Sequence, residues 1–376
     1  MNQYIARYYN LFELCKPGKA LVIFGPRQVG KTTLLNHFLA ETKLKYRLDS
    51  GDNIKTQEIL GSQDFKKIQE YVAGYELLAI DEAQRIPNVG QGLKIIVDTM
   101  PDVAVIATGS SSFELSGQVG EPLTGRKTTI TLYPIAQAEL ASTANQYERT
   151  QLLPDLLVYG SYPAIFTATS KEEKKRMLEE LVQSYLLKDI LELEQIKSSK
   201  ILLDLLRLIA FQVGNEVSLT ELGSQLQIDY KTVARYLDLF EKSFILYNLR
   251  GYSRNLRKEV TKKSKYYFYD NGIRNAIISN FNPLEIRNDQ GQLWENFLVA
   301  ERLKTQSYRG IYANNYFWRT WDQKEIDWIE EREGTLFAYE FKFSPQKISL
   351  IKDFTAAYPN AKMAIVHREN YEEFLG

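Results

Sequence analysis

Short apolar runs separated by helical patterns dominate residues 1–110. Continuous apolar segments at 21–24, 77–80 and 103–107 predict strands that are buried in a sheet. Residues 33–39, which follow the first of these strands, have the apolar spacing of a helix. This alternation predicts an α/β fold for the N-terminal part of the chain.

Helical periodicity replaces this pattern after residue 134. Residues 171–193 are rich in Glu, Lys and Leu, with apolar side chains at helical spacing, and 200–213 predict a second amphipathic helix. The central part of the chain is therefore expected to be mainly helical.

A helix-turn-helix pattern comes next. Ser218 and Glu221 form a capping-box pattern that opens a short helix, and a longer helix is predicted over 230–243. Strands are predicted at 244–252 and 265–269. A short helix, a longer helix and two strands in this order predict a winged helix.

The C-terminal part shows the two-residue alternation of half-buried strands. Strands are predicted at 316–320, 325–329 and 336–343. In the last of them the alternation puts the aromatic side chains on one face and Glu340 with Lys342 on the other.

Composition narrows the class of protein. The chain has 376 residues, of which 44% are apolar and 25% charged, which is typical of a globular protein with two or three domains. Its 47 basic and 47 acidic residues exclude a globally basic coat for nucleic acid, although a local basic patch is compatible with them. With one cysteine, Cys15, and two histidines, neither a disulfide nor a structural zinc site is expected. The longest apolar run, 103–107, is too short to cross a bilayer and the N-terminus lacks a signal pattern, so we expect a cytoplasmic protein without a membrane partner.

A glycine-rich loop joins the first predicted strand to the first helix. Lys31 and Thr32 end a match to the Walker A pattern, in which backbone amides surround phosphates, the lysine reaches the β and γ oxygens and the hydroxyl holds magnesium. A chance match is the alternative, but the strand before the loop and the helix after it are the context that the motif needs. The sequence therefore predicts a site for ATP and Mg²⁺. Its expected residues are Gly25, Pro26, Arg27, Gln28, Val29, Gly30, Lys31, Thr32 and Thr33.

Other strand ends supply polar groups for phosphate chemistry. Asp81 and Glu82 follow the second strand and resemble a Walker B pair, in which Asp81 supports magnesium and Glu82 polarises the attacking water, although a strand can also simply end in solvated carboxylates. Ser110 follows the third strand and either contacts the γ-phosphate or forms a turn. Arg126 is either an arginine finger, which implies a homo-oligomer through the ATPase face, or a solvated surface residue.

Together these motifs resemble those of AAA+ ATPases. Residues 25–32, 81–85, 108–112 and 159–163 look like the corresponding segments of uncharacterised bacterial and archaeal AAA+ ATPases with a conserved C-terminal domain of unknown function. The resemblance covers nearly the whole chain. It implies ATP binding and hydrolysis, and a helical lid that closes over the nucleotide.

The predicted domain organisation has four parts. An AAA+ ATPase core spans 1–140, and the resemblance places the helical lid at 141–197. A winged-helix domain spans 198–280, and an α/β domain that resembles PD-(D/E)xK nucleases spans 281–376.

A basic segment lies in and between the two predicted strands of the wing. Seven basic residues and one acid, Glu259, give residues 250–265 a net charge of +6 (7 − 1). Such a hairpin can grip phosphates in a salt-sensitive way, so nucleic acid is the expected partner; a solvated turn or a protein-docking wing is the alternative. The basic residues are Arg250, Arg254, Arg257, Lys258, Lys262, Lys263 and Lys265.

Carboxylates near the C-terminus are similar to the D…ExK signature of restriction-endonuclease-like folds. Twelve residues separate Asp327 from Glu340, which Lys342 follows two positions later, and Glu295 lies on the amphipathic helix that begins at Gly291. In such a site Asp327, Glu340 and Glu295 would bind magnesium, and Lys342 would stabilise charge on the phosphate. A surface ion pair between Glu340 and Lys342 is the plainer reading.

Three functions are compatible with these features. The first is an ATPase that controls a nuclease acting on nucleic acid through Asp327, Glu340 and Lys342. The second is a nucleotide-dependent switch that binds DNA or a protein partner, with an inactive nuclease-like scaffold. The third is a signalling ATPase that recognises a protein through its wing.

Overall fold

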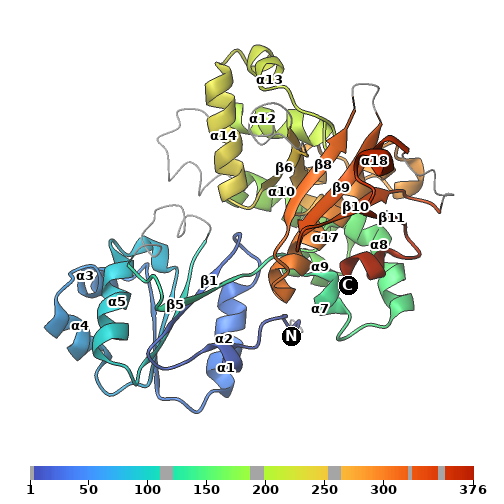
Figure 1. Cartoon of the computed structure of the whole chain (residues 1–376). Helices are drawn as coiled ribbons and strands as arrows, with labels where there is room; N and C mark the ends of the chain where they lie inside the picture. The colour runs from blue at the N-terminus through green and yellow to red at the C-terminus, as the bar shows by residue number, and fades with distance from the viewer. Residues whose placement is uncertain (1–3, 111–121, 187–198, 253–263, 321–323, 346–351) are drawn as a thin grey trace. The chain divides into compact units, whose positions relative to one another are not determined.

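The computed structural model describes residues 4–110, 122–186, 199–252, 264–320, 324–345 and 352–376 (Figure 1). Contacts between these residues divide the chain into two compact units. The first, the N-terminal unit, comprises the residues up to Pro134 together with Lys242–Phe244, and the second, the C-terminal unit, comprises most of the residues from Ile135 to Gly376.

A five-stranded parallel sheet forms the centre of the N-terminal unit. Its strand order is β2-β3-β4-β1-β5, so β1, the strand that leads into the glycine-rich loop, lies between β4 and β5. All five residues of β1 are buried, as its unbroken apolar run predicts. The strands are β1 (Ala20–Phe24), β2 (Tyr46–Ser50), β3 (Leu77–Asp81), β4 (Ala104–Thr108) and β5 (Lys127–Thr131).

Helices pack against this sheet through apolar side chains. Leu93 and Ile96 of α5 are fully buried in one core with Ile68 of α4 and the strands. A Cβ atom at Gly92 would lie 2.3 Å from the Leu60 carbonyl oxygen, so only glycine lets α5 approach α3 this closely. The helical segments are α1 (Leu11–Leu14), α2 (Lys31–Glu41), α3 (Ile54–Leu60), α4 (Phe65–Val72), η1 (Ala83–Arg85) and α5 (Val89–Thr99).

A six-stranded mixed sheet forms the centre of the C-terminal unit. Its order is β11-β10-β9-β8-β6-β7, with Arg250 of β6 in register with Tyr316 of β8. The two strands expected in the wing therefore belong to the same sheet as the expected nuclease-like strands, so the boundary predicted at residue 280 divides one sheet. The strands are β6 (Leu246–Gly251), β7 (Ser264–Phe268), β8 (Asn314–Arg319), β9 (Glu325–Arg332), β10 (Thr335–Phe341) and β11 (Lys362–Val366).

The helices predicted to form a lid pack within this C-terminal unit. The buried amide of Asn275 on α16 donates to the carbonyl oxygens of Leu157 (3.1 Å) and Val158 (2.8 Å) on α8. These bonds satisfy carbonyls at the end of α8 and tie the helix to α16. The lid role of residues 141–197 stays a prediction. The helices from this part of the chain are α7 (Gln137–Leu140), α8 (Gln146–Tyr159), α9 (Pro163–Thr167), α10 (Lys171–Glu180) and a π-helical turn, η2 (Leu181–Leu186).

The predicted helix-turn-helix residues are helical. Ser218 caps α13 by accepting the Glu221 N–H at 3.3 Å, as the capping-box pattern indicates. No helix in the described part of the chain is long and apolar enough to span a membrane. The remaining helices are α12 (Ser199–Phe211), α13 (Leu219–Leu226), α14 (Tyr230–Lys242), α16 (Asn271–Ile277), η3 (Leu284–Ile286), α17 (Gln290–Arg309), α18 (Lys352–Ala357) and α19 (Tyr371–Leu375).

A buried ion pair fixes α17 to the second sheet. Arg302 binds Glu330 of β9 through two nitrogens, with Nε to Oε1 at 2.5 Å and Nη2 to Oε2 at 2.9 Å. The Trp328 indole N–H also donates to Glu330, at 2.9 Å. Because Glu295 lies on α17 and Asp327 on β9, this pair sets the position of both predicted acidic residues.

Replacing Arg302 with Met should destabilise the protein by about 3–5 kcal/mol, because it leaves the buried Glu330 carboxylate without its partner. Urea unfolding monitored by tryptophan fluorescence measures the loss. Adding Glu330→Gln should recover part of it. A single variant as stable as the wild type would show that the pair contributes little.

Candidate functional site

The glycine-rich loop turns sharply between β1 and α2. Gly25 has φ +145°, and a Cβ atom there would lie 2.0 Å from the Leu132 carbonyl oxygen. Gln28 (φ +62°) and Gly30 (φ +91°) are both left-handed, and Gly30 is the N-cap of α2. The fully buried Val29 side chain anchors the loop between them. This curled backbone at a helix N-terminus has the features of a phosphate site.

The ammonium group of Lys31 lies inside the loop. Its Nζ donates to the carbonyl oxygens of Gly25 (2.7 Å) and Pro26 (2.8 Å), and the residue is only 7% exposed. Lys31 therefore points back over the loop that precedes it, as a Walker A lysine must in order to meet bound phosphates.

Two hydroxyl groups, one on helix α2 and one at the end of β4, meet the carboxylate at the end of β3. The Thr32 Oγ1 donates to Asp81 Oδ2 at 2.8 Å, and the Thr108 hydroxyl at the end of β4 donates to Asp81 Oδ1. The Asp81 carboxylate is thereby held next to the loop. A hydroxyl and a carboxylate are oxygen ligands that suit Mg²⁺, so Thr32 and Asp81 fit the predicted ion.

Glu82 follows in an uncommon backbone conformation. Its φ of +51° and ψ of +39° are left-handed, which turns the chain sharply after β3. The Gln84 amide donates to Glu82 Oε2 at 2.5 Å. This bond orients the carboxylate that the sequence predicts to act as a base.

Some residues near the loop were not predicted from the sequence. Thr108 was seen only as part of a polar strand end, and its contact with Asp81 required the β3–β4 pairing. Gln84 was seen only as part of the 81–85 segment, and Arg7, which donates to the Val29 carbonyl at 2.6 Å, had no recognisable signal. Ser110, which was predicted, is 1% exposed beyond β4.

Arg126 lies at the edge of the sheet opposite the loop, so it does not contact the nucleotide site of its own chain; its role as an arginine finger in a homo-oligomer stays a prediction. Its backbone carbonyl accepts the N–H of Ala20, the first residue of β1, whereas the glycine-rich loop follows the last residue of that strand. Its guanidinium pairs with Asp98. Parallel strands put their amino and carboxyl ends at opposite edges, which separates Arg126 from the loop.

A second polar cluster lies in the C-terminal unit and contains two of the predicted metal ligands. Lys265 of β7, which is 1% exposed, pairs with Glu295 (Nζ to Oε1, 3.6 Å) and with Glu325. The Tyr267 hydroxyl donates to Glu295 at 2.6 Å, and the Phe341 N–H donates to Asp327 at 2.7 Å. Asp327 and Glu295 are thus half-buried close to one lysine.

These residues form ion pairs rather than a group of metal ligands in the described structure. In the parts of the chain with assigned structure, no three carboxylate, histidine or cysteine side chains are grouped so that they could hold a metal. Glu340 is paired with Lys342 (2.7 Å), and the Lys265 ammonium already provides the positive charge beside Glu295. Magnesium binding by Glu295, Asp327 and Glu340 therefore stays a prediction that these pairings do not support.

Lys265 also departs from its predicted role in the wing. Lys265 was predicted to be one of the basic side chains that bind phosphates, but its ammonium group points into the cluster just described. Arg250 is exposed as predicted, and the other five basic residues of the wing lie outside the described residues.

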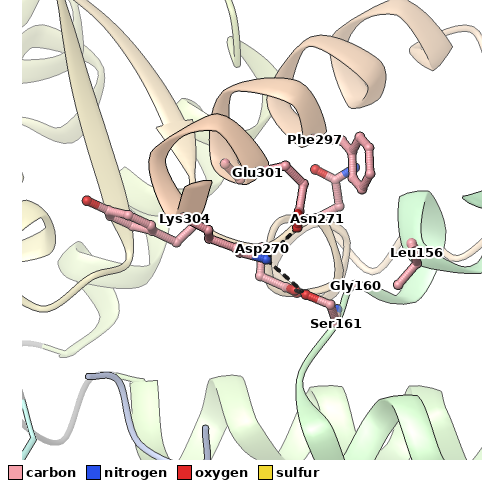
Figure 2. A pocket seen from close by; sticks show the side chains of 10 residues that line it. Leu156, Gly160, Ser161, Asp270, Asn271, Phe297, Glu301 and Lys304 are labelled. Atoms are coloured by element: carbon pink, nitrogen blue, oxygen red, sulfur yellow. Dashed lines mark hydrogen bonds and ion pairs between the residues drawn. The ribbon is translucent and has the colours of Figure 1, made fainter. Parts of the chain in front are cut away.

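Gly160 and Ser161, from the 159–163 segment that resembles AAA+ ATPases, line a small cavity in the C-terminal unit (Figure 2). Asp270 accepts the Ser161 N–H at 2.7 Å, while Lys304 binds Glu301 at 2.7 Å and the Ser161 hydroxyl at 3.2 Å. A Cβ atom at Gly160 would lie 2.0 Å from Asp270. The cavity, of about 10 Å³, is large enough for little more than one water molecule, so these charges serve the fold rather than a substrate.

Three family models match consecutive parts of the chain. Residues 17–141 match an AAA domain, which contains the glycine-rich loop and Asp81 and indicates a nucleotide-binding ATPase domain. Residues 150–284 match a domain of unknown function (DUF8612), and 290–375 match another (DUF4143). The expectation of an AAA-type domain followed by a C-terminal domain of unknown function is thus confirmed.

Similar proteins occur in bacteria and archaea. An uncharacterised protein of Mycobacterium tuberculosis is 27% identical over 328 residues, which cover 86% of this chain and 70% of the relative. One of Haemophilus influenzae is 24% identical over 377 residues (94% and 90%). One of Methanocaldococcus jannaschii is 23% identical over 389 residues (95% and 84%). The similarity extends over both units.

The half-buried carboxyl of Asp327 should make stability depend on pH. Burial, together with the nearby Glu295 and against the opposing effect of Lys265, raises the pKa of Asp327 from 3.8 to about 7. The folded protein then holds a proton in this pH range that the unfolded chain releases, so this group lowers stability as pH rises from 3.8 to about 7. Asp327→Asn should gain stability relative to the wild type over the same range, as measured by urea unfolding at several pH values.

Asp289 is a control because its pKa is shifted in the opposite direction from that of Asp327. Although burial acts in the other direction, hydrogen bonds from Arg287 and Arg274 lower the pKa of Asp289 from 3.8 to about 2. Its contribution to stability is present above pH 3.8 and is lost towards pH 2. Asp289→Asn should therefore lose stability relative to the wild type as pH rises through this lower range. Equal pH profiles for both variants would contradict the assignments.

Proposed function

We propose that this protein binds ATP at the N-terminal unit and hydrolyses it. The observation that carries the proposal is the contact of Thr32 and Thr108 with Asp81 beside the curled loop. Residues from three parts of the sequence converge there, in the arrangement that phosphoryl transfer requires. The match to an AAA domain supports the same conclusion.

Binding of the phosphates begins with the loop backbone and Lys31. The curled loop from Gly25 to Gly30 directs backbone amides towards the β- and γ-phosphates at the N-terminus of α2. Lys31 then exchanges its bonds to the loop carbonyls for charge-assisted bonds to phosphate oxygens.

Thr32 and Asp81 would hold the magnesium ion that accompanies ATP. A bound ion of this kind neutralises charge on the phosphates during transfer. The Thr108 hydroxyl keeps Asp81 oriented towards Thr32, so both oxygen ligands are in place before the nucleotide arrives.

Glu82 is the proposed general base. Its left-handed backbone and the bond from Gln84 fix the direction of the carboxylate. A carboxylate at this position can accept a proton from the water that attacks the γ-phosphate.

Two variants separate binding from hydrolysis. Lys31→Ala should lose ATP binding and turnover, because it removes the charge that meets the phosphates, whereas Glu82→Gln should retain binding and lose turnover by about 10²-fold or more. Binding of a fluorescent ATP analogue and release of phosphate measure the two steps. Full turnover by either variant would refute the role assigned to that residue.

We further propose that the C-terminal unit binds nucleic acid without cutting it. The second helix of the helix-turn-helix pair, α14, exposes Tyr230, Lys231 and Arg235 on one side. In proteins with this motif such a helix contacts the groove and the phosphates. The paired state of Lys265 with Glu295 supports binding rather than metal-dependent cleavage by Asp327, Glu340 and Lys342.

Labelled DNA and RNA test this second proposal. The double variant Lys231→Ala/Arg235→Ala should bind more weakly. The slope of the logarithm of the binding constant against the logarithm of the salt concentration should also become smaller, by about one unit per lost phosphate contact. The matched control Lys200→Ala/Arg207→Ala, on the exposed side of α12, should bind as the wild type does.

Incubation with Mg²⁺ or Mn²⁺, with and without ATP, addresses cleavage. We expect no cutting by the wild type. Cutting that Asp327→Ala abolishes would establish the nuclease hypothesis instead, and a partner retained at high salt would favour protein recognition.

A further inference from the structure

One arginine connects the segment before α1 to the glycine-rich loop. Arg7 is half-buried, and its two terminal nitrogens each donate to a backbone carbonyl, Nη1 to Val29 and Nη2 to Tyr133, both at 2.6 Å. Val29 lies within the loop, and Tyr133 follows the end of β5 by two residues. Arg7 therefore joins two backbone segments at the carboxyl edge of the sheet.

The first of these bonds fixes the direction of a peptide group. The peptide between Val29 and Gly30 is trans, so its C=O and N–H point in opposite directions. Because the Val29 carbonyl is turned towards the guanidinium, the Gly30 N–H is turned away from it. Amides at this position of a glycine-rich loop are the ones that meet phosphate oxygens.

The second bond ties the guanidinium to a rigid part of the unit. The residue next to Tyr133, Leu132, donates its N–H to the Phe24 carbonyl at 2.8 Å, which attaches this segment to β1. A planar guanidinium can serve two carbonyls at once, whereas an ammonium group is a single point donor. The sheet thus supports the loop through Arg7.

We propose that Arg7 is a positioning residue for ATP, which keeps the Gly30 N–H directed towards the phosphates. The inference rests on the proposed ATP site and adds a residue that makes no contact with the reacting atoms itself. Loss of Arg7 should leave the peptide free to rotate, so that affinity falls before the chemical step is affected.

Affinity for a fluorescent ATP analogue and steady-state turnover test this role. Arg7→Ala should weaken binding by about 10- to 100-fold and raise KM by a similar factor, with a smaller change in kcat. Arg7→Lys should fall between the alanine variant and the wild type, because one carbonyl can still be held. Guanidinium ion at non-denaturing concentration should restore binding to Arg7→Ala but not to Lys31→Ala.

Arg47→Ala is the matched control. Arg47 also donates to a backbone carbonyl, that of Tyr71 at 3.2 Å, but it does so on β2 at the edge of the same sheet. Its removal should leave ATP affinity unchanged. If the wild type binds ATP and Arg7→Ala binds equally well, the positioning role is wrong while the ATP site stands.

Two other outcomes decide the remaining cases. If Arg7→Ala does not fold but Arg7→Lys folds and binds like the wild type, Arg7 has only a structural role. If the wild type itself binds no ATP, the proposed function fails.

Discussion

The phosphate site depends on the parallel alignment of β1, β3 and β4. Their carboxyl ends reach the same edge of the sheet, and β4 lies between the other two strands. Thr32 and Asp81 can therefore form a hydrogen bond although 49 residues separate them, and Thr108 reaches Asp81 across 27. The loop, the helix N-terminus and these oxygen atoms form one site only because the strand order brings them together.

The C-terminal unit depends on a different constraint, which is that buried charges need partners. Helix α17 supplies many of them: Glu295 pairs with Lys265, and Arg302 with Glu330. Glu301 and Lys304 on the same helix pair with each other, and the Lys304 ammonium also donates to the Ile135 carbonyl at 3.2 Å. One helix thereby organises several polar contacts between segments that are distant in sequence.

This contrast distinguishes a site for chemistry from a polar core. In the N-terminal unit Thr32 is exposed and Asp81 and Glu82 are half-buried, so a ligand can reach the groups that would act on it. In the C-terminal cluster Lys265 is 1% exposed and neutralises the carboxylates beside it. Similar residue types form the proposed site for nucleotide chemistry in the first case and hold the fold together in the second.

The sequence by itself determined the elements whose pattern is local. The apolar runs of β1, β3 and β4, the glycine-rich loop and the capped helix α13 were predictable because each depends on neighbouring residues. The short polar strands β2 and β5 had no such pattern, since β2 is half-exposed along its length.

Tertiary structure decided how distant segments combine. It put Arg126 at the edge opposite the loop, added Thr108 and Arg7 to the site, and joined the expected wing strands to the C-terminal sheet. It also turned Lys265 inwards, against its expected role in binding phosphates. Strand order and burial fix these outcomes, and both arise from long-range packing that no local pattern encodes.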